Sequence, residues 1–211
     1  QAENKKYVFL IDEAHNLASR AKEMYSSSVS YGDVRSLYRE ISLCEKEYGS
    51  SDTVKALKDA VNVFGKRLRS ISSLCNESTF ADRDGIKHGF YLSSTPVDRL
   101  SKAADELEKA LIEFKRGNRS SPIYSAVNTF LSDLSYFAEQ MRTPADGMRY
   151  YISLDGDEIT AKCMCVDPSV AIAERLEFAS SAIFFSATLS PTEYYVKVLS
   201  NGKKSTLLTL N

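Results

Sequence analysis

Three stretches of the chain place apolar residues at alternating steps of three and four, which lines them up along one side of an α-helix. They run from residue 54 to 75, from 97 to 114 and from 123 to 141. So narrow a stripe is typical of helices that pack as in coiled coils. A less regular repeat from 34 to 48 predicts a fourth helix. We therefore predict an antiparallel bundle, whose helices of roughly 20 residues would be about 30–35 Å long.

The residues that bound these stretches fit helix ends. Thr95-Pro96 and Ser121-Pro122 each place a capping residue before a proline that suits the first helical position. Asp98 stands three residues after Thr95, as in a capping box. Glycine and proline then mark the helix ends, at Gly49, Gly117 and Pro144. We expect two of the helices to begin at the prolines.

Two stretches between helices carry basic residues that suit nucleic acid. Residues 76–94 are long for a loop in a compact domain. Basic and aromatic side chains that contact phosphates or stack on bases are interleaved there: Arg83, Lys87, His88, Phe90 and Tyr91. A mobile, solvated loop is the alternative. In the basic run 115–119, cations that complement a helix dipole are the simpler interpretation.

A smaller β part follows the helices. Residues 149–154 and 159–166 alternate apolar and polar side chains on either side of Asp155-Gly156, which predicts a β-hairpin over 149–166. Asp167-Pro168-Ser169 then opens a helix that ends before Ser180. The pattern as a whole predicts a mostly α protein with minor β structure.

Two further apolar runs, one near each end of the chain, lead directly into polar residues. Val8–Ile11 is followed by Asp-Glu-Ala-His at 12–15, and Ala182–Phe185 by Ser-Ala-Thr-Leu-Ser-Pro at 186–191. Buried strands of a parallel sheet have this form, and their carboxyl ends meet at one edge. We therefore expect the two polar segments to form one site.

These polar side chains suit phosphate chemistry. Asp12 is placed to hold Mg²⁺ through water, because Mg²⁺ prefers one or two carboxylates together with phosphate oxygens. Glu13 is placed to orient or deprotonate an attacking water. His15 adds a switchable donor or acceptor, and the hydroxyls of Ser186 and Thr188 suit hydrogen bonds to a carboxylate or to His15. Taken alone, Asp-Glu-Ala-His also fits a helix start with Asp12 as its N-cap.

Composition narrows the classes of function. The 211 residues include 27 basic and 28 acidic side chains, so nucleic acid would have to bind at a local patch. No apolar run is long enough to span a membrane and no signal peptide is visible, which favours a cytoplasmic protein.

The four cysteines do not fit a metal site, because no C-x₂-C pair occurs among them. Cys163 and Cys165 would lie on one face of a strand, and Cys44 and Cys75 fall on apolar helical stripes. We interpret all four as reduced thiols packed like small apolar side chains.

The two polar motifs, in this order, resemble the XPD/DinG group of superfamily-two DNA helicases. In that family a DEAH box, matched by residues 11–17, and an S-A-T-L-S-P or S-G-T-L-S-P box, matched by 186–191, flank an inserted arch domain. Residues 165–169 are similar to the segment that re-enters the motor domain. The resemblance implies a helical arch inserted between strands of a truncated RecA-like α/β motor domain. Its parts would be a motor remnant with the DEAH box at 1–30, the arch at 31–166 and a second remnant with motif III at 167–211.

The resemblance also implies a function. The parent protein would be an ATP-dependent DNA helicase of 5′ to 3′ polarity, with ATP and Mg²⁺ as cofactors, single-stranded DNA as partner and a role in DNA repair. Asp12 would hold Mg²⁺, Glu13 would activate water, and residues 186–188 would link hydrolysis to strand movement. The arch would help to form a passage for one DNA strand.

Several parts of the family's pattern are missing from this sequence. It has no G-x-x-x-x-G-K-[ST] phosphate-binding loop, no arginine motifs of the second motor domain and no four-cysteine iron–sulfur module. We expect a piece of a helicase that alone neither hydrolyses ATP nor unwinds DNA. Its partners would include the missing domains of the parent chain, in which an iron–sulfur cluster is possible. The alternatives are a non-catalytic arch module that docks a protein or clamps DNA passively, and a helical protein with fortuitous motifs.

Overall fold

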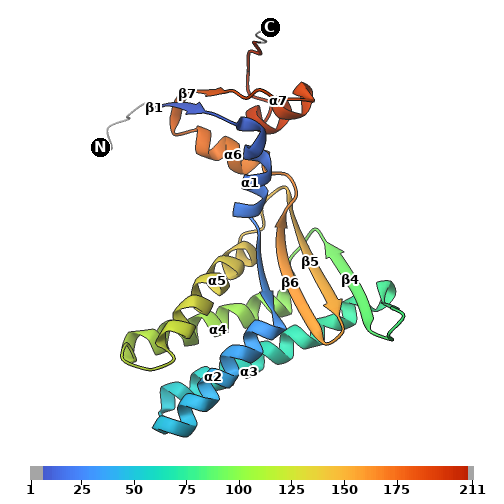
Figure 1. Cartoon of the computed structure of the whole chain (residues 1–211). Helices are drawn as coiled ribbons and strands as arrows, with labels where there is room; N and C mark the ends of the chain where they lie inside the picture. Colours follow the sequence, from blue (N-terminus) through green and yellow to red (C-terminus); the bar gives the residue numbers. More distant parts are fainter. Residues whose placement is uncertain (1–6, 209–211) are drawn as a thin grey trace. The chain divides into compact units, whose positions relative to one another are not determined.

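The structure is a computed structural model that describes residues 7–208 (Figure 1). Its residues form two compact units. The first combines the described parts of 1–26, 146–148 and 165–211, and the second combines 27–145 and 149–164. The prediction of a mostly helical chain with a smaller β part is confirmed. None of the helices within residues 7–208 is both long and apolar enough to cross a membrane.

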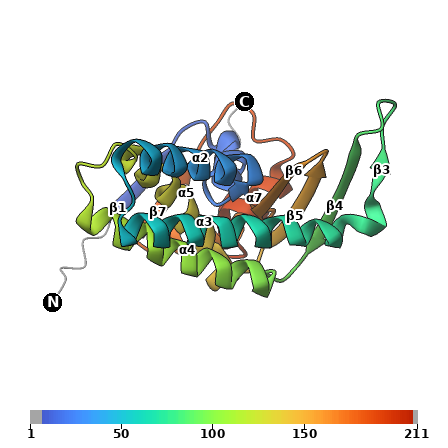
Figure 2. The same ribbon diagram turned by 90° about the horizontal axis from the view of Figure 1, so that it is seen from below.

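Long helices make up most of the second unit: α2 (Tyr31–Tyr48), α3 (Asp52–Ser70), α4 (Asp98–Gly117) and α5 (Tyr124–Arg142). Each forms over one of the predicted apolar stretches and buries its stripe. α3 packs against α2 and α4, and α5 packs against α4 and α2 (Figure 2). The largest fully buried side chains come mainly from these stripes, among them Phe64, Phe114, Phe137, Ile41, Leu57, Leu107 and Leu134.

The predicted starts of α4 and α5 are wrong, because each helix begins two residues after its proline and has no side-chain cap. Thr95 instead donates its backbone N–H to Ser93 Oγ (3.0 Å), so the capping box predicted for Thr95 and Asp98 does not form. Tyr124 donates its backbone N–H to the carbonyl of Ser121 (3.0 Å). Both prolines therefore lie in the turns that precede the helices.

The second unit also contains a five-stranded sheet in the order β2-β6-β5-β4-β3. β5 (Met148–Asp155) and β6 (Glu158–Cys165) confirm the predicted hairpin, and its turn has Gly156 in the left-handed region with φ 60°. β2 (Ser27–Ser30) adds to β6 on one side, and β4 (Lys87–Ser93) adds to β5 on the other, both antiparallel.

The prediction of a long loop over 76–94 is wrong. The segment forms the end of a 3₁₀ helix (Ile71–Ser78), the short strand β3 (Phe80–Ala81) and β4. Residues 88–93 of β4 pair with β5, and Gly89 lies so close to the preceding helix that a Cβ there would stand 3.2 Å from Cys75 Cβ. The strand has little apolar alternation because glycine occupies its most buried position.

The cysteines behave as predicted. All four are free and buried. Cys163 and Cys165 lie on the same buried face of β6, as a period of two requires. Burial raises the pKa of Cys163 to about 12, and it raises the pKa of Cys75 and Cys165 as well. These thiols therefore serve packing and carry almost no thiolate at neutral pH.

The first unit is built on a two-stranded parallel sheet in which β1 (Tyr7–Ile11) pairs with β7 (Ala179–Phe184). It also contains α1 (Leu17–Met24), α6 (Ser169–Leu176) and α7 (Thr192–Ser200). α6 starts at the predicted Asp-Pro-Ser segment and ends before Ser180, as expected. The buried side chains of this unit form one small cluster: Ala14, Ala18, Ala21, Ile172, Val198 and Leu199.

Candidate functional site

The carboxyl ends of β1 and β7 lie side by side, which confirms the predicted pairing. Ile11 is the Cα partner of Phe184. The ladder continues past the strands, because Phe185 N–H donates to the Ile11 carbonyl (3.0 Å) and Ala14 N–H donates to the Phe185 carbonyl (3.2 Å). Two segments that are far apart in the sequence, 12–15 and 186–188, are thereby fixed at one edge of the sheet.

Asp12 and Glu13 form a tight turn as the chain leaves β1. Glu13 has φ 51°, in the left-handed region that non-glycine residues seldom adopt, and its N–H donates to Asp12 Oδ1 (2.7 Å). The 3₁₀ helix that follows (Ala14–Asn16) has no side-chain cap, so the alternative of Asp12 as a helix N-cap is wrong. Within residues 7–208, Asp12 Oδ2 makes no hydrogen bond and stays available to a ligand.

His15 joins the two segments. Its Nδ1 lies 2.8 Å from Ser186 Oγ and 3.1 Å from Glu13 Oε2. An ionised Glu13 carboxylate accepts only, so it favours the tautomer of His15 that carries its proton on Nδ1. Ser186 Oγ also accepts the backbone N–H of Thr188 (3.2 Å). The Ser186 hydroxyl then holds both the imidazole and its own turn.

The structure thus brings together four of the five residues predicted for this site. Asp12, Glu13, His15 and Ser186 are linked by direct or shared hydrogen bonds. Thr188 joins through its backbone, whereas its side chain is exposed. The contact between Glu13 and His15 was not predicted. The signal that could have predicted it is their spacing, because the two residues stand only two positions apart within one turn.

The second predicted set, at 83–91, does not form one surface. Along β4, His88 and Phe90 lie on one face, and Lys87 and Tyr91 on the other, since neighbouring residues of a strand alternate. His88 is held between Asp82 (Nε2 to Oδ2, 3.1 Å) and Asp155 (Nδ1 to Oδ1, 3.0 Å), and its ring stacks on Phe80. The hydrogen bond from His88, together with backbone N–H groups, lowers the pKa of Asp82. Carboxylates beside the imidazole make this spot a poor match for phosphate.

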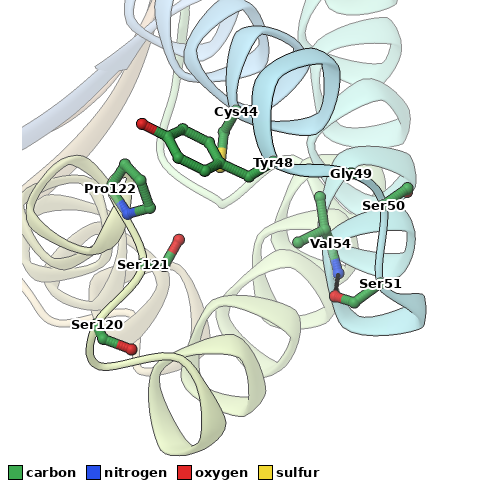
Figure 3. A pocket seen from close by; sticks show the side chains of 9 residues that line it. All are labelled: Cys44, Tyr48, Gly49, Ser50, Ser51, Val54, Ser120, Ser121 and Pro122. Carbon is green, nitrogen blue, oxygen red and sulfur yellow. Dashed lines mark hydrogen bonds between the residues drawn. The ribbon is translucent and has the colours of Figure 1, made fainter.

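The end of α2, the start of α3 and the segment before α5 line an open pocket of about 530 Å³ (Figure 3). Its lining is mostly small and hydroxylic: Cys44, Tyr48, Gly49, Ser50, Ser51, Val54, Ser120, Ser121 and Pro122. Ser51 is already engaged, because its Oγ caps α3 by accepting the N–H of Val54 (3.3 Å). No carboxylate, imidazole or amine lines the pocket, so we assign it no chemistry.

The chain was compared with known proteins, and no family model matches it. It is 24% identical, over 219 aligned residues, to the ATP-dependent DNA helicase CHL1 of Debaryomyces hansenii, with 91% of this chain and 25% of that protein covered. For the CHL1 helicase of Coccidioides immitis the values are 22% identity, 90% and 24%. A solved structure, that of S. tokodaii Xpd4, matches 88% of this chain and 34% of the other with 20% identity and a TM-score of 0.44.

By sequence, the chain is homologous to the CHL1 ATP-dependent DNA helicases. The chain spans about a quarter of the length of these relatives.

Proposed function

We propose that this chain is part of an ATP-dependent DNA helicase. In this proposal the first unit belongs to its motor domain and the second is the arch, with the helicase parts divided near residues 30 and 166. The observation that carries the proposal is the contact of 2.8 Å between His15 and Ser186, because it joins the DEAH box to the hydroxyl of the second motif across β1 and β7. The homology to CHL1 helicases supports the same function.

The residues at the sheet edge fit a magnesium nucleotide. Asp12 has one carboxylate oxygen in the turn and one without a hydrogen bond among the described residues, which suits a Mg²⁺ ion held through water. No group of three or more metal-binding side chains lies within residues 7–208. A single carboxylate is nevertheless enough here, because Mg²⁺ takes most of its other ligands from phosphate and water.

Glu13 would act on the water that attacks the terminal phosphate of ATP. Its strained backbone directs the carboxylate toward His15, whose imidazole also contacts Ser186. A movement of Glu13 on loss of the terminal phosphate would therefore change the hydrogen bond between His15 and Ser186. Because Ser186 follows β7, ATP hydrolysis would change the contacts of the second motif. That change would in turn drive movement along DNA.

The apolar surface of the small sheet supports its place in a larger motor domain. Val8, Leu10 and Ile183 are 58%, 68% and 53% exposed on β1 and β7. Parallel sheets are normally covered on both faces, and two parallel strands alone bury too little to be stable. Other parts of a motor domain would cover these side chains, as the helicase proposal requires.

The arch would help to form a passage for single-stranded DNA, and the helicase would move 5′ to 3′. A second candidate function, docking of a protein, is favoured by the outer face of the five-stranded sheet. Phe80, Phe90 and Leu92 are 60%, 52% and 52% exposed there, close to the acidic Asp82 and Asp155. Exposed apolar patches of this kind commonly mark protein contacts.

The proposal is tested in the parent protein by the Glu13→Gln variant. We expect DNA-stimulated ATP hydrolysis to fall about 100-fold or more, with binding of single-stranded DNA kept. The matched control is Glu23→Gln, an exposed carboxylate on α1 that should leave hydrolysis unchanged. The 211-residue chain alone should hydrolyse no ATP, because it lacks the phosphate-binding loop. Equal hydrolysis by the parent protein and its Glu13→Gln variant would contradict the proposed roles.

A further inference from the structure

Exposed cations gather on the last turns of α3. Lys66, Arg67 and Arg69 are all exposed, whereas Gly65 and Leu68 between them are buried. Successive helical residues are 100° apart, so the three cations point outward toward both flanks of the helix. In the sequence these cations appear as the run Lys-Arg-Leu-Arg at 66–69, in which Leu68 belongs to the buried apolar stripe.

The start of α2 extends this basic surface on one flank. The Arg69 guanidinium lies 5.5 Å from the centre of the Tyr31 ring, and a Cβ on Gly65 would stand 3.2 Å from Val34 Cγ1. These contacts place the first turns of α2 beside the last turns of α3. Arg35 follows Val34 and is exposed, so it adds a cation to the same region.

The start of α4 extends it on the other flank. Asn118 Nδ2, just after α4, donates to Thr53 Oγ1 at the beginning of α3 (3.5 Å), so the two helices run antiparallel. Arg99 and Lys102, in the first turns of α4, therefore lie level with the end of α3, and both are exposed. In Figure 2, α2, α3 and α4 lie next to one another on the viewed side.

These cations have no carboxylate partners in the part of the chain that the structure describes. None of the six forms an ion pair within residues 7–208, in contrast to Lys58, which pairs with Glu45 at 2.6 Å, and to Arg142, which binds three carboxylates. The exposed acidic residues in the first turns of α2 and α4 are fewer, namely Asp33 and Asp98. Like charges held together repel one another unless a polyanion neutralises them.

Helix dipoles explain only part of this arrangement. Arg67 and Arg69 complement the carboxyl end of α3. Arg99, however, is the second residue of α4, where the positive end of the dipole disfavours a cation. Stability of the helices alone therefore does not account for a cation at this position.

We propose that Arg35, Lys66, Arg67, Arg69, Arg99 and Lys102 form a surface that binds the phosphate backbone of nucleic acid. The surface lies on the helices and is separate from residues 83–91. Its aromatic Tyr31 is already under Arg69, so the contacts are to phosphates and independent of base sequence. The inference deepens the proposed function and rests on it in one respect, the choice of nucleic acid as the polyanion.

The test uses the 211-residue chain and a fluorescent oligothymidylate of about 30 nucleotides, with anisotropy measured at roughly 50 and 200 mM salt. The variant Lys66→Glu, Arg67→Glu, Arg69→Glu should bind about tenfold more weakly or worse at the lower salt. The slope of log affinity against log salt should fall by about 2, which is three contacts at about 0.7 each for single strands.

The matched control is Lys46→Glu, Lys109→Glu, Arg116→Glu, which removes three exposed cations elsewhere on α2 and α4 and changes net charge equally. It should bind almost as well as the unchanged chain. Equal weakening by both triple variants, or no binding by the unchanged chain, would overturn the surface. If charge reversal unfolds α3, the variant Lys66→Gln, Arg67→Gln, Arg69→Gln replaces it, and it should bind more weakly than the unchanged chain while its thermal melt stays the same. The binding of the oligothymidylate is independent of the loss of ATP hydrolysis expected for Glu13→Gln in the parent protein. The proposed helicase function and the proposed basic surface can therefore be disproved separately.

Discussion

At the scale of single residues, the proposed site consists of four polar side chains that meet just past the carboxyl ends of β1 and β7. Asp12, Glu13, His15 and Ser186 were all predicted from two polar segments after apolar runs, and the structure brings them together. The left-handed backbone of Glu13 was not predictable from the sequence. It lies next to a contact across the sheet, the hydrogen bond from Ala14 N–H to the Phe185 carbonyl. Their roles in ATP hydrolysis remain our proposal.

Gly147 is a residue that no sequence pattern singles out. It has φ 83°, and its carbonyl accepts the N–H groups of Val166 (2.8 Å) and Asp167 (3.2 Å). These bonds tie the chain just before β5 to the segment that resembles the family's re-entry into the motor domain. A close approach between two backbones that are 20 residues apart in sequence leaves no local pattern to recognise.

We predict that Gly147→Ala destabilises the protein by about 2–4 kcal/mol, because backbone strain adds to a steric clash. An added Cβ would stand 2.4 Å from the backbone oxygen of Asp167. The control is Gly49→Ala, which has a similar φ of 86° and no atom within 4 Å of the new Cβ. It should cost only about 1 kcal/mol. Urea unfolding midpoints measure both; equal losses would show that the contact with Asp167 is unimportant.

At the scale of elements, the long helices followed from the sequence, and so did the strands β1, β5, β6 and β7, whereas β2, β3 and β4 did not. The apolar stripes of α2 to α5 repeat over many residues, so each gives a strong local signal. β2 is only Ser27–Ser30, and β4 has Gly89 at its buried position, so neither shows apolar alternation. Caps were predicted least well: Ser30 and Ser51 cap α2 and α3 with their hydroxyls.

The packing of α5 on α4 is reinforced by Arg142. Its guanidinium contacts Asp105 and Glu108 on α4 at 2.8 Å each and Glu139 on its own helix at 2.9 Å. Hydrogen bonds with Glu108, Glu139 and Asp105 raise its pKa. Because the guanidinium stays charged at every accessible pH, the network depends on the three carboxylates alone.

We predict that Arg142→Met destabilises the protein by about 1–2 kcal/mol, because three carboxylates then lose a shared partner at a site that water partly screens. The matched control is Arg116→Met, whose Nη1 is 3.6 Å from Glu113 in an exposed pair, and whose effect should be near zero. Thermal melts compare the two. If Arg142→Met melts no lower than Arg116→Met, the network does not hold the helices together.

At the scale of the whole molecule, composition and net charge did not indicate where the exposed cations would lie. A net charge of −1 predicted that nucleic acid would need a local patch, but not that six cations would gather on α2, α3 and α4. Those residues are distributed over sequence positions 35–102 and meet only through helix packing. Residues 83–91, by contrast, were conspicuous in the sequence, but those that lie in β4, residues 87–91, are divided between the two faces of a sheet.

The exposed apolar face of β1 and β7 is also a property of the whole molecule. It fits a motor domain in which further elements cover the sheet, which is the proposal made above. The homology covers about 90% of this chain but only about a quarter of the CHL1 relatives. The activity of the whole protein therefore has to be measured on the parent polypeptide.

The central claim is that β1 and β7 pair in parallel, in the register that brings His15 to Ser186. Leu10 and Ile183 are Cα partners with exposed side chains, and strands about 4.8 Å apart suit a disulfide. The measurement is mass spectrometry of the digested, oxidised Leu10→Cys, Ile183→Cys variant, with Leu10→Cys, Ser181→Cys as the out-of-register control, since Ser181 pairs with Val8. We predict a disulfide-linked peptide between positions 10 and 183 and much less of it in the control. No link in the first variant, or equal links in both, would contradict the shared edge on which the proposed helicase site depends.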